Sequence, residues 1–489
     1  MTVTQPVDAS EAVRARAIIA VLVSAGLTAA IMQTVVIPLI GQFPDLLGST
    51  PAATSWIVTV TLLASAVSTP VTGRLGDLYG NRRVMTACAL SLVLGSVLCA
   101  VATSLPPMIL GRGFQGVGMG IFPLGISTMR DVLPRRYLAG ALAAVSASFG
   151  VGGAIGKPLA AVIAEVGQWQ MVFWVSAVLT AVVALLIVVL LPATPPRGSG
   201  RFDAVGAIWM SAGLVALLLG ITEAQPLLLA AGAILLVLWG RHQLRRTSPL
   251  VDLRSTSSRP LLLTNIAGTM VGATMITQGL LIPQLLQLPP GNGYGTGQSM
   301  FAMGMWTLPA GIIMLPFAPI AARVSTRYGA RTTLVVGGTV IAAGYLLTLP
   351  LLGSVWGLAT AAFVVGIGFA FAFGGMPALV LQYAPFGQGG SANGINSLAR
   401  SLGSTTASAI VGMLLAHLTV HRDGLLLPSR TGFVIGLSIG VVAALAVVAL
   451  ALAIRPDAVP GTRDGVGPDD DAAQAPALDR GREPALVDA

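Results

Sequence analysis

Charged side chains are scarce in this chain. They make up 9% of its 489 residues, whereas about a quarter of the residues of a typical soluble domain are charged. Hydrophobic residues make up 55%. Because one membrane-crossing helix needs roughly 20 mostly apolar residues, this composition excludes an ordinary soluble domain. It predicts an all-α polytopic membrane protein.

Lysine, cysteine and histidine are nearly absent as well. Lys157 is the single lysine among 27 basic residues, and it lies inside an apolar run. Cys88 and Cys99 fall in one predicted helix about 16 Å apart, too far for a disulfide bond, and their spacing matches no metal motif. The three histidines form no nucleophile or metal constellation. We therefore expect no metal, no cofactor and no enzymatic activity.

Acidic residues are missing from the middle of the apolar runs. Of the 18 acidic residues, eight lie in 456–489 beside three arginines, and we predict that this segment is a disordered cytoplasmic tail. The remaining chain is strongly basic, but its arginines occur in short clusters between apolar runs. That pattern is typical of membrane topology and not of a continuous nucleic-acid-binding face.

Hydropathy predicts fourteen membrane spans. Their approximate limits are 17–40, 51–72, 83–104, 107–129, 137–164, 169–192, 204–222, 225–240, 260–285, 297–322, 331–352, 355–381, 391–417 and 431–454. With the N-terminus inside, 19 arginines lie in inner segments and only Arg422 and Arg430 lie in outer loops. The excess of arginine on one side therefore predicts that both termini are cytoplasmic.

An internal repeat divides the chain into two halves. RLGDLYGNRR (74–83) recurs as RVSTRYGART (323–332), with Arg, Tyr, Gly and Arg at matching positions 249 residues apart. Two equivalent halves are what alternating-access transporters use. We expect a cytoplasmic N-terminal tail at 1–16, a six-helix bundle at 17–192, a two-helix linker at 193–259 and a second six-helix bundle at 260–455.

Several motifs resemble those of one transporter family. The loop GRLGDLYGNRR (73–83) resembles the signature loop of the major facilitator superfamily. GRGFQGVGMG (111–120), SFGVGGAIGKPLAA (148–161), PLVDLR (249–254) and ANGINSLARSLGSTTASA (392–409) resemble motifs of its fourteen-helix drug:proton antiporters. The resemblance covers about residues 15–455. It implies a major facilitator fold with spans arranged as six, two and six, in the cytoplasmic membrane of a bacterium.

The resemblance also implies a gating role for the signature loop. In the first half it points to Gly73, Arg74, Asp77, Gly80, Arg82 and Arg83, and the repeat adds Arg323, Gly329 and Arg331. A carboxylate at the inner membrane surface can face a helix N-terminus, which carries partial positive charge, or pair with an arginine. Such a contact would hold the inner gate shut. The alternative is that the loop arginines merely fix topology.

Three cations lie within predicted spans. Intramembrane charge is costly and marks a functional-site candidate, although long side chains can also reach toward the interface. We predict a cavity lined by these cations and nearby amides: Arg112, Lys157, Arg400, Gln33, Gln115, Asn393 and Asn396. In the resembling exporters, the segment with Gly152, Gly156 and Pro158 distinguishes export from uptake. Ordinary small-residue packing is the compatible alternative.

The chain departs from its resembling family at one position. Met32 stands where many fourteen-helix antiporters carry a first-helix aspartate. Because burial disfavours the charged form of a lysine, Lys157 is a candidate carrier of the coupling proton, followed by Glu165 and Glu223. A cationic cavity suits neutral, zwitterionic or anionic compounds better than lipophilic cations.

Three functions compete at this point. The first is proton-driven export of small amphipathic compounds such as drugs or natural products. The second is dedicated transport of an anionic or zwitterionic metabolite. The third, a membrane receptor or scaffold, lacks support because the longest inner connection (241–259) has only about 19 residues. The expected partners are a small-molecule substrate, protons and the lipid bilayer, without nucleic acid and without a second copy of the chain.

Overall fold

A computed structural model describes most of the chain. It covers residues 9–454, apart from 40–41, 55, 167, 197–201, 224, 247–248, 251–257, 291–292, 386–387 and 423–424. Three predictions made from the sequence concern segments that lie wholly or largely outside these residues. The tail at 456–489, residues 1–8 of the N-terminal tail and most of PLVDLR (249–254) lie outside the described residues.

The first half of the chain is built from helices. In chain order they are α1 (Ala9–Thr34), the 3-10 helix η1 (Ile37–Leu39), α2 (Phe43–Leu46), α3 (Pro51–Thr54), α4 (Trp56–Tyr79), α5 (Asn81–Ala100), α6 (Leu105–Gly118), α7 (Ile121–Val132), α8 (Arg135–Val166) and α9 (Gln170–Leu190). Two further long helices follow, α10 (Ala204–Thr222) and α11 (Pro226–Arg245).

The second half adds helices and one small hairpin. The helices are α13 (Arg259–Gln287), α14 (Met300–Ile312), α15 (Met314–Tyr328), α16 (Ala330–Thr348), α17 (Val355–Tyr383), α18 (Gly389–His417) and α19 (Arg430–Ala453). Between α18 and α19, β1 (Thr419–Arg422) pairs antiparallel with β2 (Leu425–Pro428), and Thr419 lies opposite Pro428.

Thirteen helical segments of the described residues are long and apolar enough to cross a membrane, with α14 and α15 counted together as one segment. The difference from the fourteen predicted spans lies at 107–129, where the structure has the two shorter helices α6 and α7 instead of one continuous helix. The break falls at Met119 and Gly120. Both residues keep right-handed helical φ and ψ angles, so α6 and α7 together still occupy the predicted span. Hydropathy did not indicate the interruption, because an apolar run stays apolar across it.

Helix boundaries also differ from the hydropathy limits. Helix α1 begins at Ala9 rather than at 17, and the predicted span 297–322 consists of α14 and α15, which continues to Tyr328. Arginine ended the apolar window at Arg14, Arg16 and Arg323. Backbone hydrogen bonds continue through such residues, since a long cationic side chain can reach the polar boundary from within a helix.

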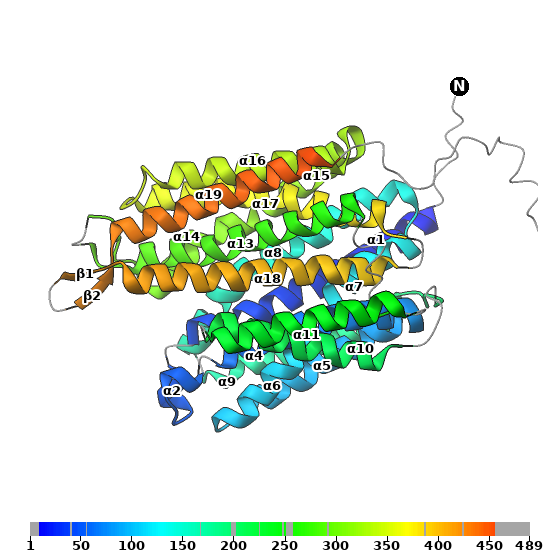
Figure 1. The fold of residues 1–489 in the computed structure, drawn as a ribbon, viewed down its shortest axis with the longest axis horizontal. Coiled ribbons are helices and arrows are strands. Elements are labelled where there is room, and N and C mark those ends of the chain that lie inside the picture. Colours follow the sequence, from blue (N-terminus) through cyan, green and yellow to red (C-terminus); the bar gives the residue numbers. More distant parts are fainter. Residues whose placement is uncertain are drawn as a thin grey trace, which may run out of the picture. The chain divides into compact units, whose positions relative to one another are not determined.

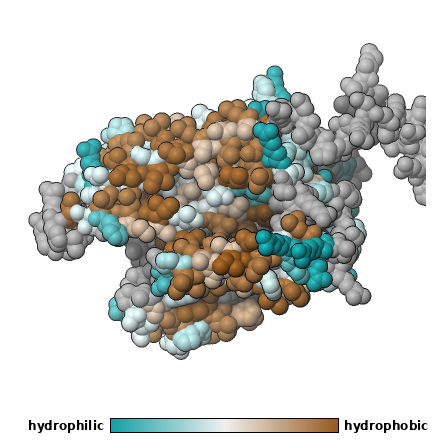
Figure 2. Space-filling view, in the orientation of Figure 1, coloured by the Kyte–Doolittle hydropathy of each residue, from teal (hydrophilic) through white to brown (hydrophobic). Residues whose placement is uncertain are grey.

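Buried apolar side chains form two large clusters. One is built by α1 and α4–α9, and the other by α13–α19 with Ala143, Ala147 and Val151 of α8. The helices run side by side along their length (Figure 1). Apolar side chains cover much of the visible face, and hydrophilic ones gather toward its ends (Figure 2). This distribution fits a bundle whose sides face lipid.

Several helix contacts join the residues of the predicted halves. Helices α4 and α7 pack on α18, and α8 packs on α14, α15 and α17. We call these contacts the α4–α18 seam and the α8 seam. Helix α10 lies along the first of them: Met210 and Leu214 cluster with Val67 of α4 and Ile395 of α18. The linker helix therefore touches both sides of that seam.

Candidate functional site

The Asp77 carboxylate crosses the α4–α18 seam. It sits at the end of α4, is only 7% exposed, and accepts the backbone N–H groups of Gly390 and Ser391, each at 3.0 Å. These two residues form the first turn of α18, whose N–H groups have no partner within the helix. Of the two partners considered from sequence, a helix N-terminus supplies these two hydrogen bonds, and the charge of Arg74 acts on the carboxylate as well.

Glycines allow this contact by bringing two backbones together. A Cβ atom added to Gly73 would lie 2.6 Å from the carbonyl oxygen of Gly390. A Cβ atom added to Gly390 would lie 2.7 Å from the Asp77 carboxylate and 2.8 Å from the Gly73 carbonyl oxygen. Any larger residue at either position would separate α4 from α18. Arg74, one turn before Asp77, is buried beside this contact.

The sequence repeat is also a repeat of contacts. The Arg82 guanidinium donates to the carbonyl oxygen of Val188 in the last turn of α9. Its counterpart Arg331 donates to the carbonyl oxygens of Ala451 and Leu452, at 3.1 and 2.7 Å, in the last turn of α19. Each arginine thereby satisfies carbonyl groups that a helix C-terminus leaves unpaired. The helix that accepts these hydrogen bonds, α9 in the first half and α19 in the second, is in each case the last long helix of its hydrophobic cluster.

The backbone of the two loops matches as well. Gly80 has a φ of 92° and Gly329 a φ of 88°, in the region that residues with a Cβ atom avoid. This explains why glycine occupies both matching positions. Arg83 and Arg323 are exposed near these loops. We call this side of the bundle, where the ends of α4 and α15 carry the repeated loops, the arginine-rich end.

Arg112 lies at the centre of a buried polar network. Its side chain is 1% exposed and donates to the carbonyl oxygens of Met32 and Ile57, at 3.0 and 3.1 Å, and to Oε1 of Gln115 at 2.6 Å. Gln115 in turn donates to Ser96. The backbone of Met32, where the resemblance led us to expect an acid, is thus a direct acceptor for Arg112.

Arg400 and the two asparagines lie on α18. The Arg400 guanidinium is 5.3 Å from the centre of the Phe373 ring and donates to Oγ of Ser397 at 3.2 Å. Asn393 donates to the carbonyl oxygen of Gly389 one turn earlier. Asn396 is buried and donates to Oδ1 of Asn265 on α13. Arg400 therefore belongs to the second cluster, whereas Arg112 belongs to the first.

Lys157 lies on α8, within the segment that carries the glycines. A Cβ atom added to Gly152 would lie 2.8 Å from Cβ of Ala30, and one added to Gly156 would lie closer still to Oγ1 of Thr34, both on α1. Pro158 contacts Gly304 of α14, since a Cβ atom added there would lie 3.3 Å from its ring. The segment consequently packs on both halves. Gln33 lies beside Thr34 on the same helix.

The three intramembrane cations have separate surroundings. Among the described residues, no hydrogen bond or ion pair joins Arg112, Lys157 and Arg400 to one another, and Lys157 has no such bond at all. Sequence reasoning missed Ser96, Gly390 and Ser391. The glycine pair at 389–390, just before the predicted span 391–417, was the one available signal for the last two, because it favours close backbone approach.

The chain was compared with known proteins. Residues 22–408 and 266–479 match the family model described as Major Facilitator Superfamily. A protein of Shigella flexneri serotype 5b (strain 8401) called "Putative multidrug resistance protein MdtD" is 27% identical over 397 residues, covering 78% of this chain and 82% of that protein. Its namesake in Escherichia coli O7:K1 (strain IAI39 / ExPEC) is 27% identical over 384 residues, covering 76% and 79%.

Solved structures show the same fold. The human organic anion transporter MFSD10 (TETRAN) superposes with a TM-score of 0.64 at 17% identity, covering 91% of this chain and all of that one. The proton:xylose symporter XylE also gives a TM-score of 0.64, at 15% identity, with 89% and 95% covered. The helix arrangement, the repeated loops and the family match over most of the sequence agree. The chain belongs to the Major Facilitator Superfamily of membrane transporters.

Proposed function

We propose that the protein exports small amphipathic compounds, such as drugs or natural products, by proton antiport. The proposal rests on the family, on relatives named as multidrug resistance proteins, and on a polar contact that joins the two halves. In this proposal the bundles at 17–192 and 260–455 rock about the linker at 193–259. The chain acts as a monomer in a bacterial cytoplasmic membrane, with both termini inside.

The observation that carries the proposal is the contact of Asp77 with the first turn of α18. A hydrogen bond to a charged group contributes about 1.5–3 kcal/mol, and Asp77 accepts two across the α4–α18 seam. In the proposed orientation this contact closes the cytoplasmic side. Substrate enters from the cytoplasm when the Asp77 contact breaks. When the contact forms again, the cytoplasmic side is closed and the substrate can leave only on the other side of the membrane.

Proton coupling requires a group that changes its charge during the cycle. Lys157 is our first candidate because it lies in the segment that contacts both halves and has no hydrogen-bond or ion-pair partner among the described residues. A neutral Lys157 would bind a proton in one conformation and release it in the other. This exchange would couple the proton gradient to opening of the cytoplasmic side. Glu165 and Glu223 are the next candidates.

Efflux from cells that lack their main pumps tests this function. Cells that express the wild type, Asp77→Asn or Glu11→Gln are loaded with dyes and antibiotics of differing charge. Efflux is measured with and without a protonophore. Glu11 is the matched control because it is an exposed acid that pairs with Arg136 away from the α4–α18 seam. We expect efflux of at least one compound that both Asp77→Asn and the protonophore abolish. No efflux of any compound would contradict a broad exporter.

A second function, dedicated transport of an anionic or zwitterionic metabolite, is favoured by Arg400. Its guanidinium contacts an aromatic ring and a serine, and no carboxylate in the described residues pairs with it. An arginine in such surroundings suits a carboxylate or phosphate of a substrate. This function predicts that Arg400→Gln abolishes transport of anions, while Arg130→Gln, which removes an exposed arginine outside the two gating loops, leaves it intact.

A further inference from the structure

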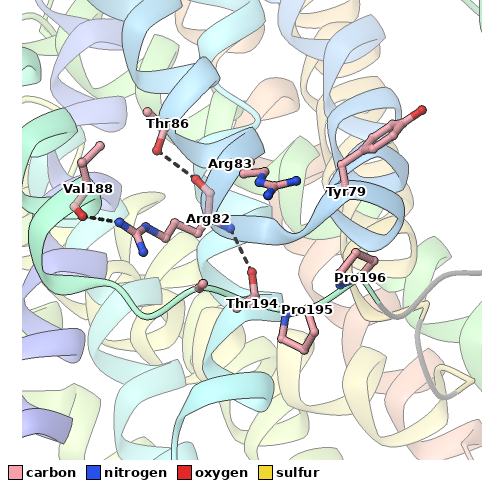
Figure 3. Close-up of a pocket in the computed structure, with 9 residues that line it drawn as sticks. Tyr79, Arg82, Arg83, Thr86, Val188, Thr194, Pro195 and Pro196 are labelled. Atoms are coloured by element: carbon pink, nitrogen blue, oxygen red, sulfur yellow. Dashed lines mark hydrogen bonds between the residues drawn. The ribbon is translucent and has the colours of Figure 1, made fainter.

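A cavity opens at the arginine-rich end of the first half, away from both seams. Its volume is about 690 Å³, and it lies between the end of α4, the start of α5, the end of α9 and residues 193–196. Tyr79, Arg82, Arg83 and Thr86 line one side, and Val188 lines the other (Figure 3). Neither the Asp77 contact nor the Arg112 network reaches it.

The cavity is lined by two arginines, and only one of them, Arg82, has hydrogen-bond partners among the described residues. None of the described residues that line it is acidic. Arg82 is held in place, because its guanidinium donates to Val188 and its backbone N–H donates to Oγ1 of Thr194 at 3.1 Å. Arg83 extends toward the side of Tyr79 (Figure 3) and has no hydrogen-bond or ion-pair partner in the part of the chain that the structure describes.

The other walls of the cavity are apolar and continue onto a lipid-facing helix. Val188, Ala193, Pro195 and Pro196 line it. On α9 the large side chains of Val182, Leu185 and Val189 are exposed at helical spacing and continue from Val188 along the bundle. Tyr79 is 51% exposed at the mouth. Tyrosine and arginine are typical of the boundary between headgroups and acyl chains.

We propose that this cavity binds the phosphate group of an anionic phospholipid from the adjacent leaflet. The Arg83 guanidinium and the Tyr79 hydroxyl donate to the phosphate oxygens, and the acyl chains lie along the exposed face of α9. Basic pockets between membrane helices are suited to such headgroups. A free phosphate ion offers the same oxygens but gains nothing from the apolar walls, so the lipid is the occupant that uses the whole cavity.

The second half lacks this arrangement despite the repeat. Thr332 stands at the position that matches Arg83, and its hydroxyl donates to the carbonyl oxygen of Tyr328. Arg327 lies 5.3 Å from the centre of the Tyr328 ring and is exposed at the same end of the bundle. Arg327→Gln therefore removes the same charge from the same end without altering the cavity, which makes it the matched control.

The test measures binding of phosphatidylglycerol to the full-length chain purified in detergent. Native mass spectrometry gives the lipid affinity for wild type, Arg83→Gln, Arg327→Gln and Ala193→Trp, the last of which fills the cavity without changing its charge. Phosphatidylcholine and inorganic phosphate are added as competitors. Since one basic residue near a membrane surface contributes about 1 kcal/mol to anionic lipid binding, we expect Arg83→Gln to weaken phosphatidylglycerol binding about fivefold. Ala193→Trp should weaken it at least as much.

The outcomes distinguish a lipid in the cavity from charge attraction and from a free anion. Equal effects of Arg83→Gln and Arg327→Gln, or no effect of either, would overturn the proposal, because general charge would then account for lipid retention. Unchanged binding to Ala193→Trp would place the lipid outside the cavity. Inorganic phosphate that competes as well as phosphatidylglycerol would make the cavity a free-anion site instead. Transport is not needed for any of these readouts, so the inference stands or falls independently of the proposed function.

Discussion

Asp77 and Ser391 lie 314 positions apart in the sequence, yet the backbone N–H of Ser391 donates to the Asp77 carboxylate at 3.0 Å. The acceptor ends a helix of the first half, and the donor begins a helix of the second. A single carboxylate on α4 therefore holds α18 across the α4–α18 seam. If Asp77 is replaced, opening of that seam can be measured.

Asp77→Asn should open the arginine-rich end. An amide can accept only one of the two N–H groups and loses the charge, so the closed state should be weakened by about 2 kcal/mol, or roughly 30-fold in the equilibrium. A cysteine placed at buried Ser391 reports this, because maleimide labels it only when the seam opens. The native Cys88 and Cys99 are buried and give a low background.

The labelling experiment has a clear negative outcome. Glu11→Gln removes a carboxylate from an exposed ion pair with Arg136 and should leave the labelling rate of the Ser391 cysteine unchanged. Equal labelling of the Asp77→Asn and Glu11→Gln proteins would show that Asp77 does not hold the seam closed.

Gly73→Ala should also impair closure, for a steric reason. The new methyl group would lie 2.6 Å from the Gly390 carbonyl oxygen, which belongs to a helix backbone and cannot move aside without shifting α18. We expect transport to fall severalfold at unchanged expression. Gly140→Ala is the control, since nothing lies within 4 Å of a Cβ atom at that position of α8. Full activity of Gly73→Ala would argue against a tight α4–α18 seam during the cycle.

Arg112 should contribute to stability through its three acceptors. Arg112→Gln removes the charged donor from the carbonyl oxygens of Met32 and Ile57, of which Ile57 keeps the Thr61 hydroxyl as a partner. A hydrogen bond to a charged group contributes about 1.5–3 kcal/mol. We expect the thermal unfolding midpoint of the purified protein to fall by several degrees. Arg112→Lys should recover part of the loss, because an ammonium group can donate to some of the same oxygens. Arg130→Gln, at an exposed arginine, should leave the midpoint unchanged.

Lys157→Leu tests the proposed route of the proton. If Lys157 carries it, uptake and release by this side chain set the pH dependence, and the leucine variant should lose proton-driven efflux while still exchanging substrate down its own gradient. The measurement is efflux from proteoliposomes across a range of pH gradients. Transport by Lys157→Leu with the wild-type pH profile would instead move the search to Glu165 and Glu223.

Much of the fold could be predicted from composition and the arginine clusters. Hydropathy located the long helices because a lipid-facing helix must be apolar over most of its length. It did not locate the break at Met119 and Gly120, since the chain stays apolar there. It also ended α15 too early at Arg323, because hydropathy measures side chains whereas a helix is held by backbone hydrogen bonds.

The site was only partly predictable for a related reason. The motifs identified Asp77 and Arg112 as residues of interest, but most of their partners are backbone groups: the N–H groups of Gly390 and Ser391, and the carbonyl oxygens of Met32 and Ile57. Every residue except proline carries both groups. The sequence therefore offers no chemical signal for which of them meets a given side chain, and only the fold determines it.

The position of α10 makes the bundle unequal on its two sides. Met210, Leu214 and Leu218 lie on successive turns and pack across α4 and α18. Helix α10 therefore stands between that seam and the surrounding acyl chains. An amphipathic compound dissolves largely in the bilayer before it meets a transporter. In the proposed export of such a compound, α10 would shield the α4–α18 seam from direct entry out of the lipid, and the α8 seam, where α8 meets α14 and α15, would be the uncovered one.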